Sequence, residues 1–122
     1  MQEEKQRKIN DLRTKLSRYP KVPIGNPTPI QSLNNVSDDL GLEVIVKRDD
    51  LNGPAFGGHY SHALEYVFGE VLQNNHDSII YGGASQSNEN RLIAAVCAQY
   101  GIKAHLILRK KLPVDRRDQG NI

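Results

Sequence analysis

Two short glycine-rich stretches carry the residue types that could do chemistry. The first is GGHYSHALEY, residues 57–66, in which two glycines precede a histidine and a tyrosine. The second is GGASQSN, residues 82–88, which offers the hydroxyl groups of Ser85 and Ser87. Each stretch leads into a helical pattern, and a helix N-terminus presents free N–H groups and a partial positive charge. The second stretch therefore suits an anion, whereas the simpler alternative is that Ser85 or Ser87 only caps the helix.

The other reactive side chains form weaker patterns. His59 and His62 stand three residues apart, but zinc needs a third and usually a fourth ligand, so no metal site is predicted. Cys97 is the only cysteine and lies in the apolar run AAVCAQY, which favours an inert core thiol. Asp49 and Asp50 could pair as an acid and a base, although adjacent acids more often cap or solvate a loop.

Composition limits the class of protein. The 122 residues are 38% hydrophobic and 25% charged with a net charge of +2, which predicts one soluble domain. That balance argues against a dedicated nucleic-acid or membrane-surface protein, and the basic tail from Arg109 to Arg117 lacks interleaved aromatic residues. No apolar run has the length of a membrane span, and MQEEKQRKIN has no signal-type apolar core, so a cytoplasmic location is expected.

The first third of the chain is predicted to be a helix and an extended arm, residues 1–41. Residues 2–17 carry one apolar stripe at helical spacing, formed by Ile9, Leu12 and Leu16. Four prolines between 20 and 29 then forbid a helix. Residues 32–40 could add a short helix, which Gly41 would end.

The remainder, 42–122, alternates between strand and helix patterns. Strands are predicted at 42–47, 78–81 and 104–108 because these runs are short, apolar and rich in β-branched residues. The two helices between them have predicted core faces, which comprise Leu64, Val67, Phe68, Val71 and Leu72 in the first and Leu92, Ile93, Val96, Cys97 and Tyr100 in the second. This order predicts an α/β fold, with three-layer βαβ units on a small parallel sheet and a polar tail after it. Functional loops in such sheets follow the carboxyl ends of strands, which here are 48–59 and 82–88.

Five motifs in order give the chain a family resemblance. They are PTPIQSL, IVKRDDLNG, FGG-x-x-x-x-ALEY, YGGASQSN-x-x-R and A-x-YGIKAHLIL. Together they resemble the fold type II pyridoxal-phosphate family of 1-aminocyclopropane-1-carboxylate deaminases and D-cysteine desulfhydrases, related to the tryptophan synthase β subunit. The resemblance covers residues 18–122 and implies a partial tryptophan synthase β-like fold, pyridoxal phosphate as cofactor and a small amino acid as substrate.

The resemblance also exposes a departure at the first glycine-rich loop. In the family this loop reads G-G-N-K, and its lysine anchors the cofactor covalently. The matching residues here are Gly57, Gly58, His59 and Tyr60, and a phenol cannot condense with an aldehyde. Lys47 is a nearby amine, but it belongs to the strand-end motif KRDD and does not match the anchoring position.

The second loop keeps the family pattern. Ser87 matches a serine beside the substrate, and Asn88 matches an asparagine that hydrogen-bonds the cofactor. The resemblance further implies that Ser85, Gln86 and Ser87 hold the substrate carboxylate. As catalytic candidates it leaves Ser87 and, at the lysine position, Tyr60, which is not competent for covalent anchoring. Glu89 replaces a histidine or glutamine found in many relatives.

Three hypotheses about function follow. The family chain continues well beyond QGNI, residues 119–122, so this sequence is expected to be a truncated, inactive relative of deaminases and desulfhydrases. The first alternative is the N-terminal subunit of a split pyridoxal-phosphate enzyme, completed by a separate C-terminal half. The second is a non-catalytic binding or assembly module, for which homo-oligomers are expected because a cut parallel sheet exposes edges and apolar faces.

Overall fold

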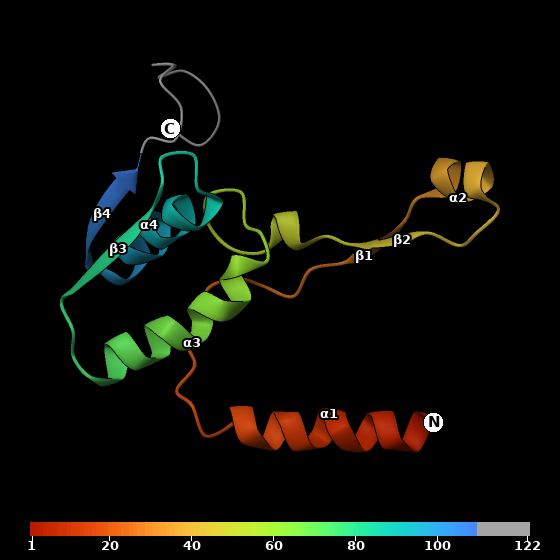
Figure 1. Cartoon of the computed structure of the whole chain (residues 1–122), viewed down its shortest axis with the longest axis horizontal. Coiled ribbons are helices and arrows are strands. Elements are labelled where there is room, and N and C mark those ends of the chain that lie inside the picture. The colour runs from red at the N-terminus through yellow and green to blue at the C-terminus, as the bar shows by residue number, and fades with distance from the viewer. Residues whose placement is uncertain (110–122) are drawn as a thin grey trace.

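A computed structural model describes residues 1–109 of the chain. The predicted loop tail therefore lies outside the described residues, except for Arg109. The described part forms a body with two projecting arms (Figure 1). Its elements in chain order are α1 (Gln2–Leu16), β1 (Ile30–Ser32), α2 (Asn34–Leu40), β2 (Ile45–Lys47), the 3-10 helix η1 (Asp49–Leu51), α3 (Tyr60–Gln73), β3 (Ser78–Ala84), α4 (Asn88–Tyr100) and β4 (Lys103–Arg109).

The body is built on a parallel pair of strands, which confirms the predicted α/β class with a small parallel sheet. β3 and β4 pair in register from Ser78 opposite Lys103 to Ala84 opposite Arg109. β3 extends beyond the predicted end at residue 81 because Gly82, Gly83 and Ala84 continue the ladder. A Cβ atom on Gly83 would lie 2.9 Å from Asn90 Oδ1, so this glycine allows α4 to approach the strand.

Helix α4 lies at the centre of the body. It packs against both strands and against α3, whereas α3 contacts no strand of the described part. The predicted inward face of α4 is confirmed, since Leu92, Ile93, Val96 and Cys97 are buried and Tyr100 packs against them. Gly101 ends the helix in the left-handed conformation, with a φ of 69°, as predicted for a C-terminal glycine.

Helix α3 confirms most, but not all, of its predicted core face. Leu64 and Phe68 are buried, and Val71 and Leu72 are half-buried against the core. The prediction for Val67 was wrong, because its side chain is 46% exposed. Among the helices and strands of residues 1–109 only α4 packs against α3, so the buried stripe of α3 is narrower than the helical spacing of its apolar residues suggests.

The prediction that residues 42–47 join the parallel sheet was also wrong. β2 covers only Ile45–Lys47 and pairs antiparallel with β1, from Ile30 opposite Lys47 to Ser32 opposite Ile45. The short α2 connects these strands and ends at Gly41 in the left-handed conformation, as expected. The sequence did not predict β1, because its three residues directly follow a proline-rich segment and are too few to show the alternating pattern of a strand. The two strands and α2 form the upper arm of Figure 1, hereafter the hairpin arm, residues 30–47.

The proline-rich segment runs as an extended chain across the surface of α3. Val22 N–H donates to Glu65 O at 3.0 Å, and Lys21 Nζ pairs with the Glu65 carboxylate at 2.8 Å. Tyr100 O–H donates to Pro23 O from the neighbouring helix. Gly69 makes the crossing possible, because a Cβ atom there would lie 2.3 Å from Pro20 O.

Two apolar surfaces stay uncovered in the described part. The outer face of the parallel pair exposes Ile80 and Ile107, with Ile80 at 73%. α1 buries none of its residues, and its predicted stripe of Ile9, Leu12 and Leu16 faces outward. None of the helices within residues 1–109 combines the length and apolar character needed to cross a membrane.

Gly69→Ala should destabilise the fold even though alanine usually favours a helix. Alanine in an open helix position stabilises by about 1 kcal/mol relative to glycine, but here the new methyl group meets the Pro20 carbonyl. Overpacking of this kind costs about 1–3 kcal/mol. Urea unfolding should therefore show a lower midpoint for Gly69→Ala, while Glu70→Ala, on the exposed neighbouring position, stays within about 0.5 kcal/mol of the wild type. If Gly69→Ala were more stable than the wild type, this would contradict the close contact between Gly69 and Pro20.

Candidate active site

A buried pair of hydrogen-bonded side chains, Asn52 and Ser61, supports the first glycine-rich loop. Asn52 Nδ2 donates to Ser61 Oγ at 2.6 Å, and Ser61 Oγ donates to Gly58 O at 2.8 Å. Both side chains are buried. Gly57 has a φ of 55° and its Cβ position lies 2.5 Å from Asn52 O, so only glycine fits there. The sequence offered no pattern for the Asn52–Ser61 pair, which joins residues nine positions apart across an irregular loop.

Charged groups on the outer side of this loop form a second network. The His62 ring contacts Asp49 at 3.2 Å, and Lys47 Nζ lies 3.6 Å from the same carboxylate. Burial raises the pKa of Asp49, but His62 and Lys47 outweigh it and hold the pKa below its usual value. Asp49 and Asp50 do not form an acid–base pair, because Asp50 binds Arg48 instead. Lys47 also donates to Thr28 O and Thr28 Oγ1, so this amine is already engaged.

The two residues at the start of α3 are stacked. His59 occupies the N-cap position without a capping side-chain bond, and Tyr60 is the first helical residue. Their ring centroids lie 4.2 Å apart with the planes tilted by 33°. The Tyr60 ring also packs against the hydrophobic core. No lysine occurs between residues 48 and 102, so the start of α3 offers an aromatic surface and no amine.

The second loop follows β3 and contains the N-cap of α4. Ser87 Oγ accepts a hydrogen bond from Asn90 N–H at 3.3 Å, which confirms that one serine caps the helix. Two backbone donors of the loop are used within the fold, since Ser85 N–H donates to Arg109 O and Ser87 N–H to Ala84 O. The Ser85 hydroxyl forms no hydrogen bond within residues 1–109. An anion at this loop would therefore be met by hydroxyl groups as well as by the helix N-terminus.

Contacts between the two loops bring them to one end of the body. The Arg91 guanidinium on α4 lies 5.7 Å from the Phe56 ring centroid on the first loop. Tyr81 on β3 donates to the Glu89 carboxylate, and Tyr60 lies close enough to act on the same phenol. The hydrogen bond from Tyr81 to Glu89, burial, the charge of Glu89 and the nearby Tyr60 phenol raise the pKa of Tyr81. Sequence reasoning missed Tyr81 as a site residue because it lies in an apolar strand.

Three buried polar atoms near the second loop have no hydrogen-bond partner among the described residues. They are Asn90 Oδ1 and the Nε and Nη1 atoms of Arg91. Arg91 Nη2 donates to Asn88 Oδ1 at 3.4 Å, and Asn90 Nδ2 donates to Ala84 O at 3.0 Å. These side chains fix the first turn of α4. Residues 1–109 contain no group of three histidine, cysteine or acidic side chains placed to hold a metal ion.

The matches to known proteins decide the family. The family model described as "Pyridoxal-phosphate dependent enzyme" matches residues 22–121.

The chain belongs to the pyridoxal-phosphate dependent enzyme family.

Within this family, the chain is similar to both named activities that its motifs suggest. It is 34% identical to the D-cysteine desulfhydrase of Serratia proteamaculans (strain 568) over 89% of this chain and 33% of that protein. It is 43% identical to the 1-aminocyclopropane-1-carboxylate deaminase of Ralstonia pickettii (strain 12J) over 75% of this chain and 28% of that protein. A crystal structure of an ACC deaminase homologue matches with a TM-score of 0.72 and 39% identity, over 79% of this chain and 30% of that one. The chain thus spans about a third of the length of these relatives.

The family cofactor does not fit the first loop of this chain as a covalently held group. Covalent anchoring needs a free amine, and the residues at the start of α3 are an imidazole and a phenol stacked on each other. The nearest amine along the chain, Lys47, is bound to Thr28 and Asp49. The second loop keeps polar groups of the kind a carboxylate needs, in Ser85 and Ser87.

Ser61→Ala should loosen the first loop. The substitution leaves the buried Asn52 amide without its 2.6 Å acceptor and removes one of the two donors to Gly58 O, whose other donor is the Ser61 backbone N–H. Leaving a buried polar group unsatisfied costs about 1–3 kcal/mol, so chemical denaturation should show that loss of unfolding free energy. Ser17→Ala removes a hydroxyl that bonds only on the exposed end of α1 and should cost less than about 0.5 kcal/mol. Equal losses in both variants would refute a supporting role for Ser61.

Glu89→Gln should lower the pKa of Tyr81 towards the ordinary tyrosine value of about 10. In the wild type, ionised Tyr81 would face the Glu89 carboxylate, and this arrangement raises the phenol pKa. Glutamine keeps the size of the side chain and removes its charge. NMR titration of ¹³C-labelled tyrosine would follow each phenol separately, with Tyr19, which is 64% exposed, as internal control. An unchanged Tyr81 titration in Glu89→Gln would contradict the contact.

Proposed function

We propose that this chain is a relative of pyridoxal-phosphate deaminases and desulfhydrases that binds a small amino acid but does not by itself turn it over. The observation that carries the proposal is Tyr60 at the start of α3, at the position where the family resemblance expects the anchoring lysine. A phenol cannot form the covalent link to an aldehyde. The stacked His59 ring and the core-packed Tyr60 ring also leave no flexible amine to replace it.

The residue roles follow from the resemblance and the contacts together. Ser85, Gln86 and Ser87 hold the substrate carboxylate at the N-terminus of α4, where the partial positive charge favours an anion. Asn88, Gly57, Gly58 and His59 line the position of the cofactor. Ser87 remains the candidate for moving a proton, but its hydroxyl is a poor base without an activating partner, and its oxygen already accepts the Asn90 N–H.

The substrate class is a small amino acid. The similar proteins are named for D-cysteine and for 1-aminocyclopropane-1-carboxylate, and both molecules present an α-carboxylate of the kind that the second loop suits. Identity to these two proteins is 34% over 110 residues and 43% over 96 residues, so the longer match is the less identical one and neither substrate is favoured. We therefore assign the carboxylate site to the chain and leave the choice between these two substrates to binding measurements.

One observation favours a second candidate, a subunit of a split enzyme. The outer face of the β3–β4 pair exposes Ile80 and Ile107, a surface that a second polypeptide carrying the remaining family motifs would cover. An adjacent reading frame that encodes those motifs would favour this candidate. A genome without such a frame would leave the non-catalytic relative as the better account.

Tyr60→Lys tests the proposal by restoring the amine. With pyridoxal phosphate and borohydride, the variant should acquire one reduced cofactor adduct, and peptide mapping should place it at residue 60. The wild-type chain should show no site modified stoichiometrically. Glu70→Lys adds a lysine at an exposed position later on the same helix and is the matched control for non-specific modification. A stoichiometric adduct in the wild type would overturn the proposal.

A further inference from the structure

Glu89, in the first turn of α4, differs from the other half-buried acids of the fold. Among residues 1–109 three acidic side chains are half-buried: Asp49, Glu65 and Glu89. Lys47 lies 3.6 Å from the first carboxylate and Lys21 lies 2.8 Å from the second. Glu89 forms no ion pair with any described residue. Because withdrawing a charge from water without pairing it is costly, Glu89 is suited to a cationic ligand.

The groups around Glu89 position it without neutralising its charge. The Tyr81 phenol donates to its carboxylate, and Tyr60 lies close to the same phenol. Arg91 is the only lysine or arginine between residues 49 and 102. It lies two positions from Glu89 along the helix, so the two side chains do not face each other. The carboxylate therefore stays available, in surroundings of tyrosine rings that also attract cations.

A second acceptor without a partner lies in the same turn of α4. Asn90 is 3% exposed, and its Oδ1 atom has no hydrogen-bond partner among the described residues. This atom faces β3, since a Cβ atom on Gly83 would lie 2.9 Å from it. Tyr81 is two positions from Gly83 and so lies on the same side of the strand. The Glu89 carboxylate and Asn90 Oδ1 thus lie over one side of β3, and neither has a cationic donor within residues 1–109.

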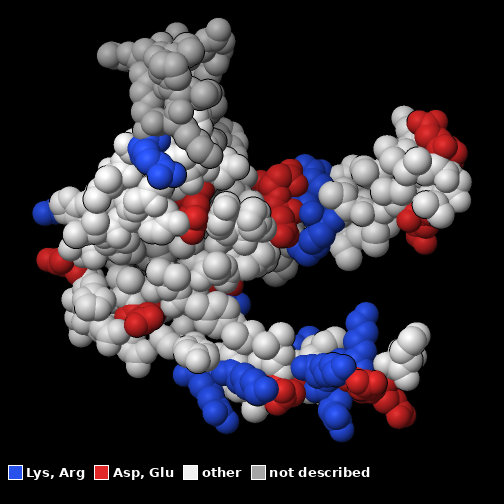
Figure 2. All heavy atoms as spheres, viewed as in Figure 1, with Lys and Arg blue, Asp and Glu red and all other residues white. Residues whose placement is uncertain are grey.

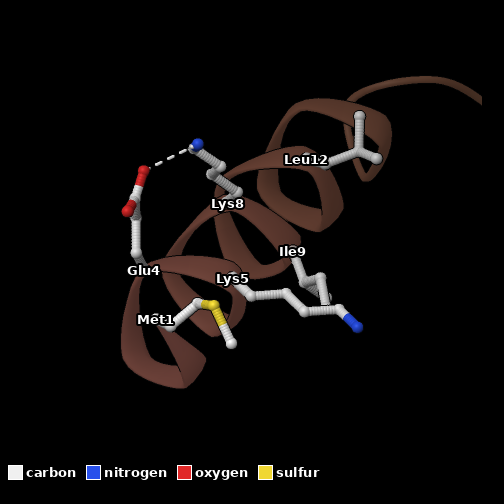
Figure 3. Close-up of a pocket in the computed structure, with 6 residues that line it drawn as sticks. All are labelled: Met1, Glu4, Lys5, Lys8, Ile9 and Leu12. Carbon is white, nitrogen blue, oxygen red and sulfur yellow. Dashed lines mark ion pairs between the residues drawn. The ribbon is translucent and has the colours of Figure 1, made fainter.

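The other charged surfaces of residues 1–109 offer no comparable acid. Figure 2 shows lysine and arginine side chains gathered mainly on α1 and at the base of the hairpin arm. A groove on α1 contains one acid, Glu4, but Lys8 binds this carboxylate at 2.7 Å (Figure 3). The other acids of the described part that form no ion pair are exposed to solvent. Glu89 is thus the one half-buried carboxylate in residues 1–109 that a cation does not already pair.

We propose that Glu89 binds the α-ammonium group of the amino acid whose carboxylate the second loop holds. This inference rests on the proposed function and names the feature of the ligand that is selected. With a phenol at residue 60 the amino group is not drawn into a covalent link, so it stays protonated at pH 7 and needs an acceptor. A ligand with a carboxylate alone would meet Glu89 as a like charge. Glu89 therefore selects α-amino acids against carboxylic acids of the same shape.

Two ligands of nearly one shape test this selection on the full chain. Cyclopropanecarboxylate is 1-aminocyclopropane-1-carboxylate without its amino group. NMR titration of the ¹⁵N-labelled chain at pH 7 gives both dissociation constants, with the amide signals of residues 85–88 as reporters. The wild type should bind the amino acid at least about tenfold more tightly, as expected for a hydrogen bond between charged groups. In Glu89→Gln this preference should fall at least about tenfold, because the amino acid loses an ion pair while the plain acid loses a repulsion.

Opposite changes in the two affinities separate recognition from damage to the fold. Structural damage would weaken both ligands, whereas the proposal requires that Glu89→Gln weakens binding of the amino acid and strengthens binding of the plain acid. Glu70→Gln, at an exposed position on α3, should leave both dissociation constants unchanged. If the wild type binds the two ligands equally, or if Glu89→Gln weakens both equally, the inference is overturned while the carboxylate site stands. If neither ligand binds to the wild type, the proposed function fails together with the inference.

Discussion

The packing of α3 against α4 is the constraint on which the candidate site depends. Each glycine-rich loop ends at the N-terminus of one of these helices, so the helix contact places the two loops together. Phe68 and Val96, one from each helix, are among the largest fully buried side chains. Gly69 and Gly83 permit two neighbouring contacts, since Gly69 lets the proline-rich segment cross α3 and Gly83 lets Asn90 of α4 approach β3. The site therefore depends on close contacts that lie away from its polar residues.

The two glycine-rich loops at this end of the body differ in the chemical groups that they present. The second loop has the parts that an amino-acid carboxylate requires: a capped helix N-terminus, two serine hydroxyls and a fixed first turn. The first loop has two glycines with positive φ, Gly57 and Gly58, and is held by the Asn52–Ser61 pair. It presents aromatic rings where covalent chemistry needs an amine. On the proposed function, the shape of the site has been kept while its reactive group has changed, so family membership does not imply turnover.

Local patterns predicted the elements well and their pairing less well. The helix periods of α3 and α4 and the C-terminal Gly101 follow from side-chain spacing and glycine geometry, and the structure has them. β2 was placed in the wrong sheet because a β-branched run indicates a strand without indicating its neighbour, and β1 is too short to carry a pattern. The loop residues of the family motifs could be identified from sequence. The contacts of Tyr81 with Glu89 and of Arg91 with Phe56 could not, since only the fold shows how these side chains lie relative to one another.

The central claim is that this chain retains a carboxylate-binding loop without the means of turnover. The most direct test is an assay of the wild-type chain alone, with saturating pyridoxal phosphate, for release of ammonia and sulfide from D-cysteine and of ammonia from 1-aminocyclopropane-1-carboxylate. The account predicts rates equal to those of free pyridoxal phosphate without protein. Release that exceeds this blank and scales with the concentration of the purified chain would contradict it.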